Sequence, residues 1–245
     1  MRFRGSIAVL AAAAVVVVSA TLSQALEVSP MVAKLTPTGA GSSYRLTVRN
    51  NSATPATVEI EVYRMQVDES GARSLTPEEN DIAVFPVQSV IPANRDQVAQ
   101  IRYVGDPGAQ SGMYLVRVGQ LPIDMQTIAG DGEAGADIKV AFTINTYVFV
   151  APASARASVE VTGLDRAPNG DLLLTAHNTG PGFAHLREAR FTLTTSDGRA
   201  REVPAQSVDV GEVSVMPGGA KRRIRIPAAV IGALDGQVTA SIALL

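Results

Sequence analysis

Apolar residues recur at every second position through most of the chain from residue 27 onward, and a spacing of two predicts β-strands. Segment 44–49 alternates aromatic or aliphatic residues with polar ones, and segment 57–62 does the same. No sustained three-and-four spacing appears, so long amphipathic helices are not expected. Strands with one apolar and one polar face are typical of antiparallel sheets that cover a core on one side.

The candidate strands form two series separated by Pro152, and each series is expected to build one sandwich. Seven short strands with turns between them are typical of an immunoglobulin-like sandwich, and the second series is slightly shorter. The sequence therefore predicts an all-β protein with two immunoglobulin-like β-sandwich domains in tandem, at 26–150 and 151–245. The candidate strands are 27–36, 44–49, 57–62, 82–91, 97–104, 113–121 and 138–150, then 157–163, 171–177, 189–195, 206–215, 221–226 and 238–244.

The first 25 residues resemble a secretory signal peptide. Arg2 and Arg4 precede an uncharged apolar run at 7–18, and Ser23 and Ala25 place small residues where a signal peptidase reads the chain. A membrane anchor is the alternative, but twelve apolar residues are fewer than the roughly 18 to 20 that span a bilayer. We expect cleavage after Ala25, a periplasmic protein, and no membrane span in the mature chain.

The composition argues against most enzyme chemistry. With no cysteine there is no disulfide, thiolate metal site or cysteine nucleophile, and only two histidines are present. His177 and His185 have no carboxylate between them at a ligand-like spacing, so we expect polar residues near a hairpin, no metal site and no cofactor. The 21 basic residues, against 23 acidic ones, form no basic run that would favour nucleic-acid binding.

Two glycine-containing connections interrupt the first strand series. Segment 66–80 is polar and is expected to be an ordinary surface connection. Segment 128–137 fits G-x-G-x-x-G at 130–135, but a strand follows instead of a helix and its acids would repel a phosphate, so we expect a mobile loop.

Segment 138–150 is unusually long for a strand of such a domain. Thirteen residues span about 43 Å at ~3.3 Å per residue. A 125-residue domain treated as a sphere is only about 36 Å across. Large apolar residues alternate along the segment, which allows two interpretations. It is either a core strand leading into the linker, or an exposed edge strand that pairs with a partner.

Several short motifs, in their order along the chain, resemble the periplasmic pilus-assembly chaperones, the PapD-like family. The resemblance covers essentially all of the mature chain and points to a divergent branch. The motifs are VIPANRDQVAQIRY at 90–103, GMYLVRVGQLP at 112–122, a long strand ending in VFVAP at 148–152, and LLLTAHNTG and VMPGGAKRRIRIP in the second domain.

The resemblance implies donor-strand complementation. In that family the chaperone lends its last first-domain strand to a pilus subunit that lacks one, and delivers the subunit to an outer-membrane usher without a nucleotide. By position, the side chains inserted into the subunit are Ile138, Val140, Phe142 and Ile144.

One position departs from the family pattern. The best-described members of that family anchor the subunit's terminal carboxylate with an arginine on the first strand and a lysine on the donor strand. The corresponding positions here hold Met31 or Val32 and Tyr147, which cannot pair with a carboxylate. Either the anchor has moved, with Arg102 and Arg117 as candidates, or the chain binds without one. Alternatively, each arginine is an ordinary charged strand residue on a solvated face. Arg102 could instead form an internal ion pair.

Two other function classes stay open at this point. A structural or adhesive cell-envelope protein would use 138–150 as an ordinary core strand. A hydrolase would need activity that depends on His177 or His185, and no catalytic residue is expected.

Overall fold

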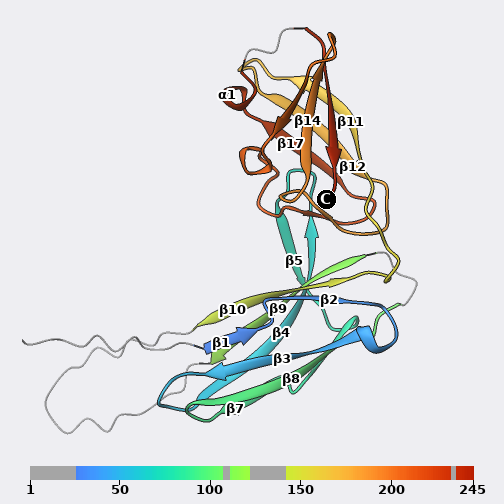
Figure 1. Cartoon of the computed structure of the whole chain (residues 1–245). Coiled ribbons are helices and arrows are strands. Elements are labelled where there is room, and N and C mark those ends of the chain that lie inside the picture. Colours follow the sequence, from blue (N-terminus) through green and yellow to red (C-terminus); the bar gives the residue numbers. More distant parts are fainter. Residues whose placement is uncertain (1–25, 107–110, 122–141, 233–235) are drawn as a thin grey trace, which may run out of the picture.

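The computed structural model describes residues 26–106, 111–121, 142–232 and 236–245. The expected signal peptide at 1–25, the glycine-containing segment 128–137, Ile138 and Val140 lie outside the described residues. The described chain is almost entirely β, and it forms two immunoglobulin-like sandwiches in tandem (Figure 1). The fold class predicted from the sequence is therefore confirmed.

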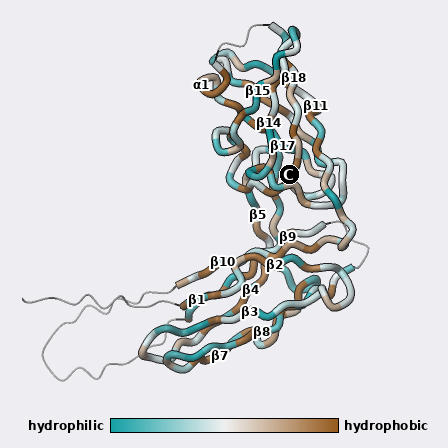
Figure 2. Tube along the Cα trace, viewed as in Figure 1, coloured by the Kyte–Doolittle hydropathy of each residue, from teal (hydrophilic) through white to brown (hydrophobic). Residues whose placement is uncertain are grey.

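The first domain packs two sheets face to face, and Figure 2 shows hydrophobic and hydrophilic residues alternating along its strands. Leu46, Val48 and Ile101 from one sheet and Val116 and Val148 from the other are fully buried between them. One sheet has the order β1 (Leu26–Ser29), β3 (Ser43–Asn50), β8 (Arg95–Tyr103), β6 (Ile82–Phe85). The other has the order β2 (Val32–Leu35), β10 (Thr143–Val150), β9 (Gly112–Leu121), β4 (Ala56–Val67), β5 (Arg73–Pro77), and β7 (Gln88–Ile91) also pairs with β4.

The second domain encloses a separate core around Leu174, Phe191, Leu193 and Ile224. Its larger sheets are β11 (Val159–Arg166), β12 (Leu172–Asn178), β17 (Lys221–Ile226), and β15 (Ala200–Val203), β14 (Arg190–Thr195), β18 (Val238–Ala243). The short strands β13 (Ala184–His185) and β16 (Val215–Met216) form a pair, and single turns of helix lie at η2 (Ala205–Ser207) and α1 (Ala228–Ile231). A further single turn, η1 (Ala40–Ser42), lies in the first domain.

Two predicted strands are each divided between the sheets of the first domain. Segment 27–36 breaks at Pro30 into β1 and β2, and segment 82–91 breaks at Pro86 into β6 and β7. Proline has no backbone N–H for a ladder, so a strand ends or changes partner there. The predicted strand at 206–215 is wrong. It holds η2 and an irregular loop, whose carbonyls at Val210 and Val213 accept hydrogen bonds from the Arg222 side chain.

The prediction of a surface connection at 66–80 is also wrong. β4 continues to Val67, and β5 pairs antiparallel with it, so the segment is a β-hairpin. This hairpin leaves the first sandwich and reaches the second domain (Figure 1). The two strands pair through backbone hydrogen bonds. Most of their side chains are polar, so no apolar alternation in the sequence predicts the pairing.

Candidate functional site

The first half of β10 has an open edge. β9 pairs with β10 along its whole length, from Thr143 to Val150, whereas β2 pairs only with Tyr147–Val150. The Tyr147 N–H donates to the Met31 carbonyl at 2.9 Å, so the odd-numbered residues of β10 direct their backbone groups toward the β2 side. Among the described residues, no strand pairs with Thr143 and Asn145 on that side.

The even-numbered side chains of β10, together with Phe142 just before it, change from buried to exposed toward this open end. Val148 and Val150 are buried in the core of the first domain, and Ile144 is half-buried against the same core. Phe142, whose carbonyl accepts a hydrogen bond from the Gln120 N–H, is 39% exposed. Phe142 and Ile144 therefore lie on the face of the strand that covers the core, but the core ends before the open end of the strand. Ile138 and Val140 continue this parity in the sequence.

The other face of β10 forms the floor of a cleft between the domains. In register across the sheet, Tyr147 lies between Val32 of β2 and Leu115 of β9. Two residues on, Phe149 lies beside Met113 and contacts Phe183 of the second domain edge-on, with ring centroids 5.2 Å apart. Val32 and Tyr147, where the family resemblance would place the carboxylate anchor, are therefore adjacent in space. Val32 is 51% exposed.

Cavities flank this floor on both sides of Phe149. One, of about 420 Å³, is lined by Arg73 and Tyr147 of the first domain and Glu212 of the second. The Tyr147 hydroxyl accepts a hydrogen bond from Arg73 at 3.2 Å, and Arg73 also pairs with Glu212 at 2.8 Å. The other cavity, of about 400 Å³, is lined by Lys34, Arg156, Phe183 and His185 among others.

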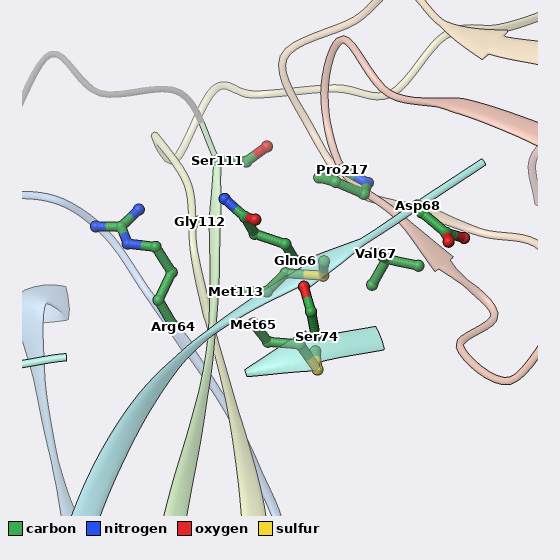
Figure 3. Close-up of a pocket in the computed structure, with 10 residues that line it drawn as sticks. All are labelled: Arg64, Met65, Gln66, Val67, Asp68, Ser74, Ser111, Gly112, Met113 and Pro217. Atoms are coloured by element: carbon green, nitrogen blue, oxygen red, sulfur yellow. The ribbon is translucent and has the colours of Figure 1, made fainter. Parts of the chain in front are cut away.

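A third cavity, of about 460 Å³, lies on the β4 side of the domain junction (Figure 3). Met65 and Met113 of the first domain and Pro217 of the second contribute to its lining. Its polar residues include Arg64, which forms ion pairs with Glu78 and Asp81 and is therefore already neutralised.

The two anchor candidates, Arg102 and Arg117, lie on different sheets. Arg102 is on β8, exposed on the outer face of the first sheet, and forms no ion pair with any described residue. Arg117 is on β9 of the second sheet, directly opposite Asn145 of the open half of β10. The structure therefore places only Arg117 beside the open edge.

Arg117 is held by aromatic and acidic neighbours from β4. Its guanidinium lies 4.4 Å from the centre of the Tyr63 ring, donates to the Tyr63 hydroxyl at 2.9 Å, and approaches Glu61 at 3.6 Å. Arg117 Nε and Asn145 Oδ1 are buried, and neither has a hydrogen-bond partner among the described residues. A donor and an acceptor on facing strands are thus left unsatisfied next to the open edge.

Sequence reasoning missed two cations of the cleft, Lys34 and Arg73. Lys34 is two residues beyond Val32, so the spacing of two that placed Val32 also places Lys34 on the cleft face. Arg73 was in the segment interpreted as a surface connection, and no sequence pattern placed it against Tyr147.

No family model and no curated protein matches the chain. Solved structures do. The class 5 fimbriae chaperone CfaA aligns with a TM-score of 0.58 and 11% identity, over 90% of this chain and 99% of that one. The E. coli chaperone DraB aligns with a TM-score of 0.53 and 19% identity, over 83% and 85% of the two chains.

A chain of the CsuC–CsuE chaperone–tip adhesion subunit pre-assembly complex, from archaic chaperone-usher Csu pili of Acinetobacter baumannii, aligns with a TM-score of 0.52 and 13% identity, over 89% and 97%. At these identities the likeness establishes the fold. The chain shares the arrangement of two immunoglobulin-like domains found in fimbrial chaperones, as the sequence resemblance predicted.

Proposed function

We propose that this protein is a periplasmic, non-enzymatic chaperone that folds and caps pilus or surface-fibre subunits by donor-strand complementation, and delivers them to an outer-membrane usher. The observation that carries the proposal is the open edge of β10 at Thr143–Thr146, with Phe142 exposed at its end. The fold shared with fimbrial chaperones supports the same function.

An edge of this kind satisfies two needs of an incomplete partner sandwich at once. The backbone groups of Thr143 and Asn145 can pair with a strand of the partner. Phe142 and Ile144, and before them Val140 and Ile138 with the same parity, can fill an apolar groove in the partner. Fully burying such a side chain contributes about 1.5–3 kcal/mol. A partner that lacks one strand gains both contributions only from an alternating edge strand.

For a subunit's terminal carboxylate, Arg117 is a better candidate than Arg102. Arg117 is next to the open edge, and its Nε and the neighbouring Asn145 Oδ1 lack partners among the described residues. Arg102 lies on the opposite sheet. Its exposed position fits an ordinary strand charge on a solvated face.

None of the described helices is long and apolar enough to cross a membrane. The described residues contain no group of three or more acidic, histidine or cysteine side chains that could hold a metal ion. We further propose that the protein is exported with cleavage after Ala25, and that its two domains span 26–150 and 151–245.

A structural or adhesive envelope protein is the second candidate. The observation in its favour is that Val148 and Val150, and partly Ile144, belong to the core of the first domain. In that case the partner strand would be dispensable, and substitutions at the open end would affect stability alone.

Co-expression of the tagged mature chain in the periplasm with candidate subunits from its own source, followed by pull-down and mass spectrometry, tests the proposal. We expect the wild type to recover a small exported β-rich subunit, and Phe142→Lys to lose it. Phe85→Lys is the matched control, because Phe85 is also exposed, at 79%, but lies on β6 of the other sheet. Equal recovery by Phe142→Lys and the wild type, or recovery of no subunit by a folded wild type, would reject the proposal.

A further inference from the structure

The tip of the β4–β5 hairpin, residues 68–72, joins the backbone of the second domain. The Arg223 N–H donates to the Glu69 carbonyl at 2.6 Å, and the Val213 N–H donates to the Gly71 carbonyl at 3.0 Å. Arg223 is in β17, the outer strand of the sheet β11–β12–β17. The tip therefore attaches to the edge of a sheet that belongs to the other domain.

Two glycines bring the backbones together more closely than side chains would allow. Gly71 and Gly211 both have positive φ, at 85° and 86°. A Cβ atom on Gly211 would lie 2.2 Å from the Ser70 carbonyl oxygen and 2.7 Å from Gly71 Cα. A Cβ on Gly71 would lie 2.5 Å from the Val210 carbonyl oxygen. The contact thus requires glycine on each side.

The tip is held in shape before it meets the second domain. The Asp68 carboxylate accepts hydrogen bonds from the Ser70 N–H at 2.8 Å, the Ser70 hydroxyl at 2.6 Å and the Ala72 N–H at 3.1 Å. The hydrogen bond from the Ser70 hydroxyl is the main reason why the pKa of Asp68 lies below its usual value. The turn is therefore ordered by its own residues.

The receiving loop of the second domain is equally well held. The Arg222 side chain is 1% exposed and donates to the carbonyls of Val210, Val213 and Val215. These bonds fix the loop around Gly211 in the shape that the hairpin tip contacts. Further support comes from ion pairs between Arg73 and Glu212, at 2.8 Å, and between Arg223 and Glu69, at 3.6 Å.

Below the tip, apolar side chains from both domains form one small cluster. Met65, Met113 and Phe149 of the first domain are buried in it, and Phe183 and Val215 of the second domain pack against them. The hairpin therefore contacts the second domain at two separate places. Apolar side chains pack at its base, and backbone hydrogen bonds form at its tip.

From these contacts we propose that the β4–β5 hairpin is a brace that holds the two domains at one fixed angle, so that the cleft floored by Tyr147 and Phe149 exists before any partner binds. Domains joined only by a linker are expected to move relative to each other unless a substantial interface prevents it. This inference does not depend on subunit binding, and it can be tested on the isolated protein.

Two glycine substitutions separate the brace from general backbone strain. Gly211→Ala places a methyl group against Ser70 and Gly71. Gly198→Ala is the matched control, since Gly198 has a φ of 84°, lies in the same domain, and has no atom within 4 Å of the place that a Cβ would occupy. Both variants carry the same penalty for alanine at positive φ, and only Gly211→Ala disrupts the contact with the hairpin.

The absence of native cysteine allows clean spin labelling. Labels on Gln100→Cys in β8 and Ala200→Cys in β15, both exposed positions, report the distance between the domains by double electron–electron resonance. We expect one narrow distance distribution for the unsubstituted background and for Gly198→Ala, and a clearly broadened one for Gly211→Ala. A broad distribution in the unsubstituted background, or a narrow unchanged one in Gly211→Ala, would overturn the proposal.

Amide hydrogen exchange gives a second readout that also shows whether the variant folds. In Gly211→Ala, exchange at Val213 and Arg223 should accelerate about tenfold or more, because their acceptors belong to the hairpin. Exchange at Arg225, which bonds to Asp209 within the second domain at 2.9 Å, should remain slow. Loss of protection at all three amides would indicate unfolding of the second domain, and would refute a role confined to the brace.

Discussion

Lysine substitution of Phe142, just before β10, and of Val148, within β10, measures where the core of the first domain ends. Phe142 is 39% exposed, so about three fifths of its side chain is buried. Full burial of phenylalanine is worth about 1.5–3 kcal/mol, so Phe142→Lys should lower the free energy of unfolding by about 1–2 kcal/mol. The lysine ammonium can reach water beside the open edge, and its stem retains part of the contact.

Val148→Lys changes a residue of the same parity in the same segment, six positions on. Val148 is 0% exposed and packed in the core. A lysine there must bury an ammonium without a partner, which costs several kcal/mol beyond the lost packing. We expect a loss of at least about 4 kcal/mol, which is enough to unfold a domain of ordinary stability.

Urea denaturation provides both values. Far-ultraviolet circular dichroism is a suitable probe because the chain has no tryptophan. Phe142→Lys should leave a cooperative transition at slightly lower urea, whereas Val148→Lys should remove the first-domain transition. If Phe142→Lys costs as much as Val148→Lys, Phe142 is a core residue and donation of this strand end would empty the core, which contradicts the proposed function.

Three further predictions concern stability and pH. Burial raises the pKa of Tyr44 to about 12, from 10 in the unfolded chain, so up to about 2–3 kcal/mol of stability is present below pH 10 and is lost as the pH rises toward 12. Tyr44→Phe should make this alkaline loss smaller in urea titrations, while Tyr63, Tyr103 and Tyr114, whose pKa values are also raised, keep the remainder. Arg222→Met leaves three loop carbonyls without their donor and should cost about 3 kcal/mol in urea denaturation, whereas no change would contradict the role given to this side chain. A hydrogen bond from Arg225 lowers the pKa of Asp209. The ionised carboxylate therefore stabilises the fold above the pKa that Asp209 has in the unfolded chain, and this stabilisation is lost as the pH falls through its pKa in the folded protein. In thermal melts between about pH 5 and pH 2, Asp209→Asn should lose less stability on acidification than the wild type.

The strand pattern could be predicted because alternation follows directly from which side chains face the core. Segment 221–226 was predicted with the observed bounds, since Ile224 and Ile226 alternate with Arg223 and Arg225. The hairpin at 66–80 was missed for the same reason. Its pairing depends on backbone groups and on a contact with the other domain, and neither leaves a period in the sequence.

The candidate site was only partly accessible from sequence. The parity of Phe142 and Ile144 could be inferred from the strand alone. That the edge is open beside them depends on where β2 begins, after the break at Pro30, which is a matter of sheet pairing. Arg117 and Arg102 looked equivalent as strand arginines, and only the assignment of β9 and β8 to different sheets separated them.

An open edge is a hazard for any exported protein, because it can pair with a second copy of itself. Here the unpaired part of β10 is short, and its odd positions are the polar residues Thr143 and Asn145. The next strand carries Arg117, whose charge is paired with that of Glu61 on β4. Two copies meeting edge to edge would gain mainly the backbone pairing of this short stretch. A partner with its own apolar groove would gain much more from the same edge. The features that limit self-association therefore also favour an incomplete sandwich as the occupant.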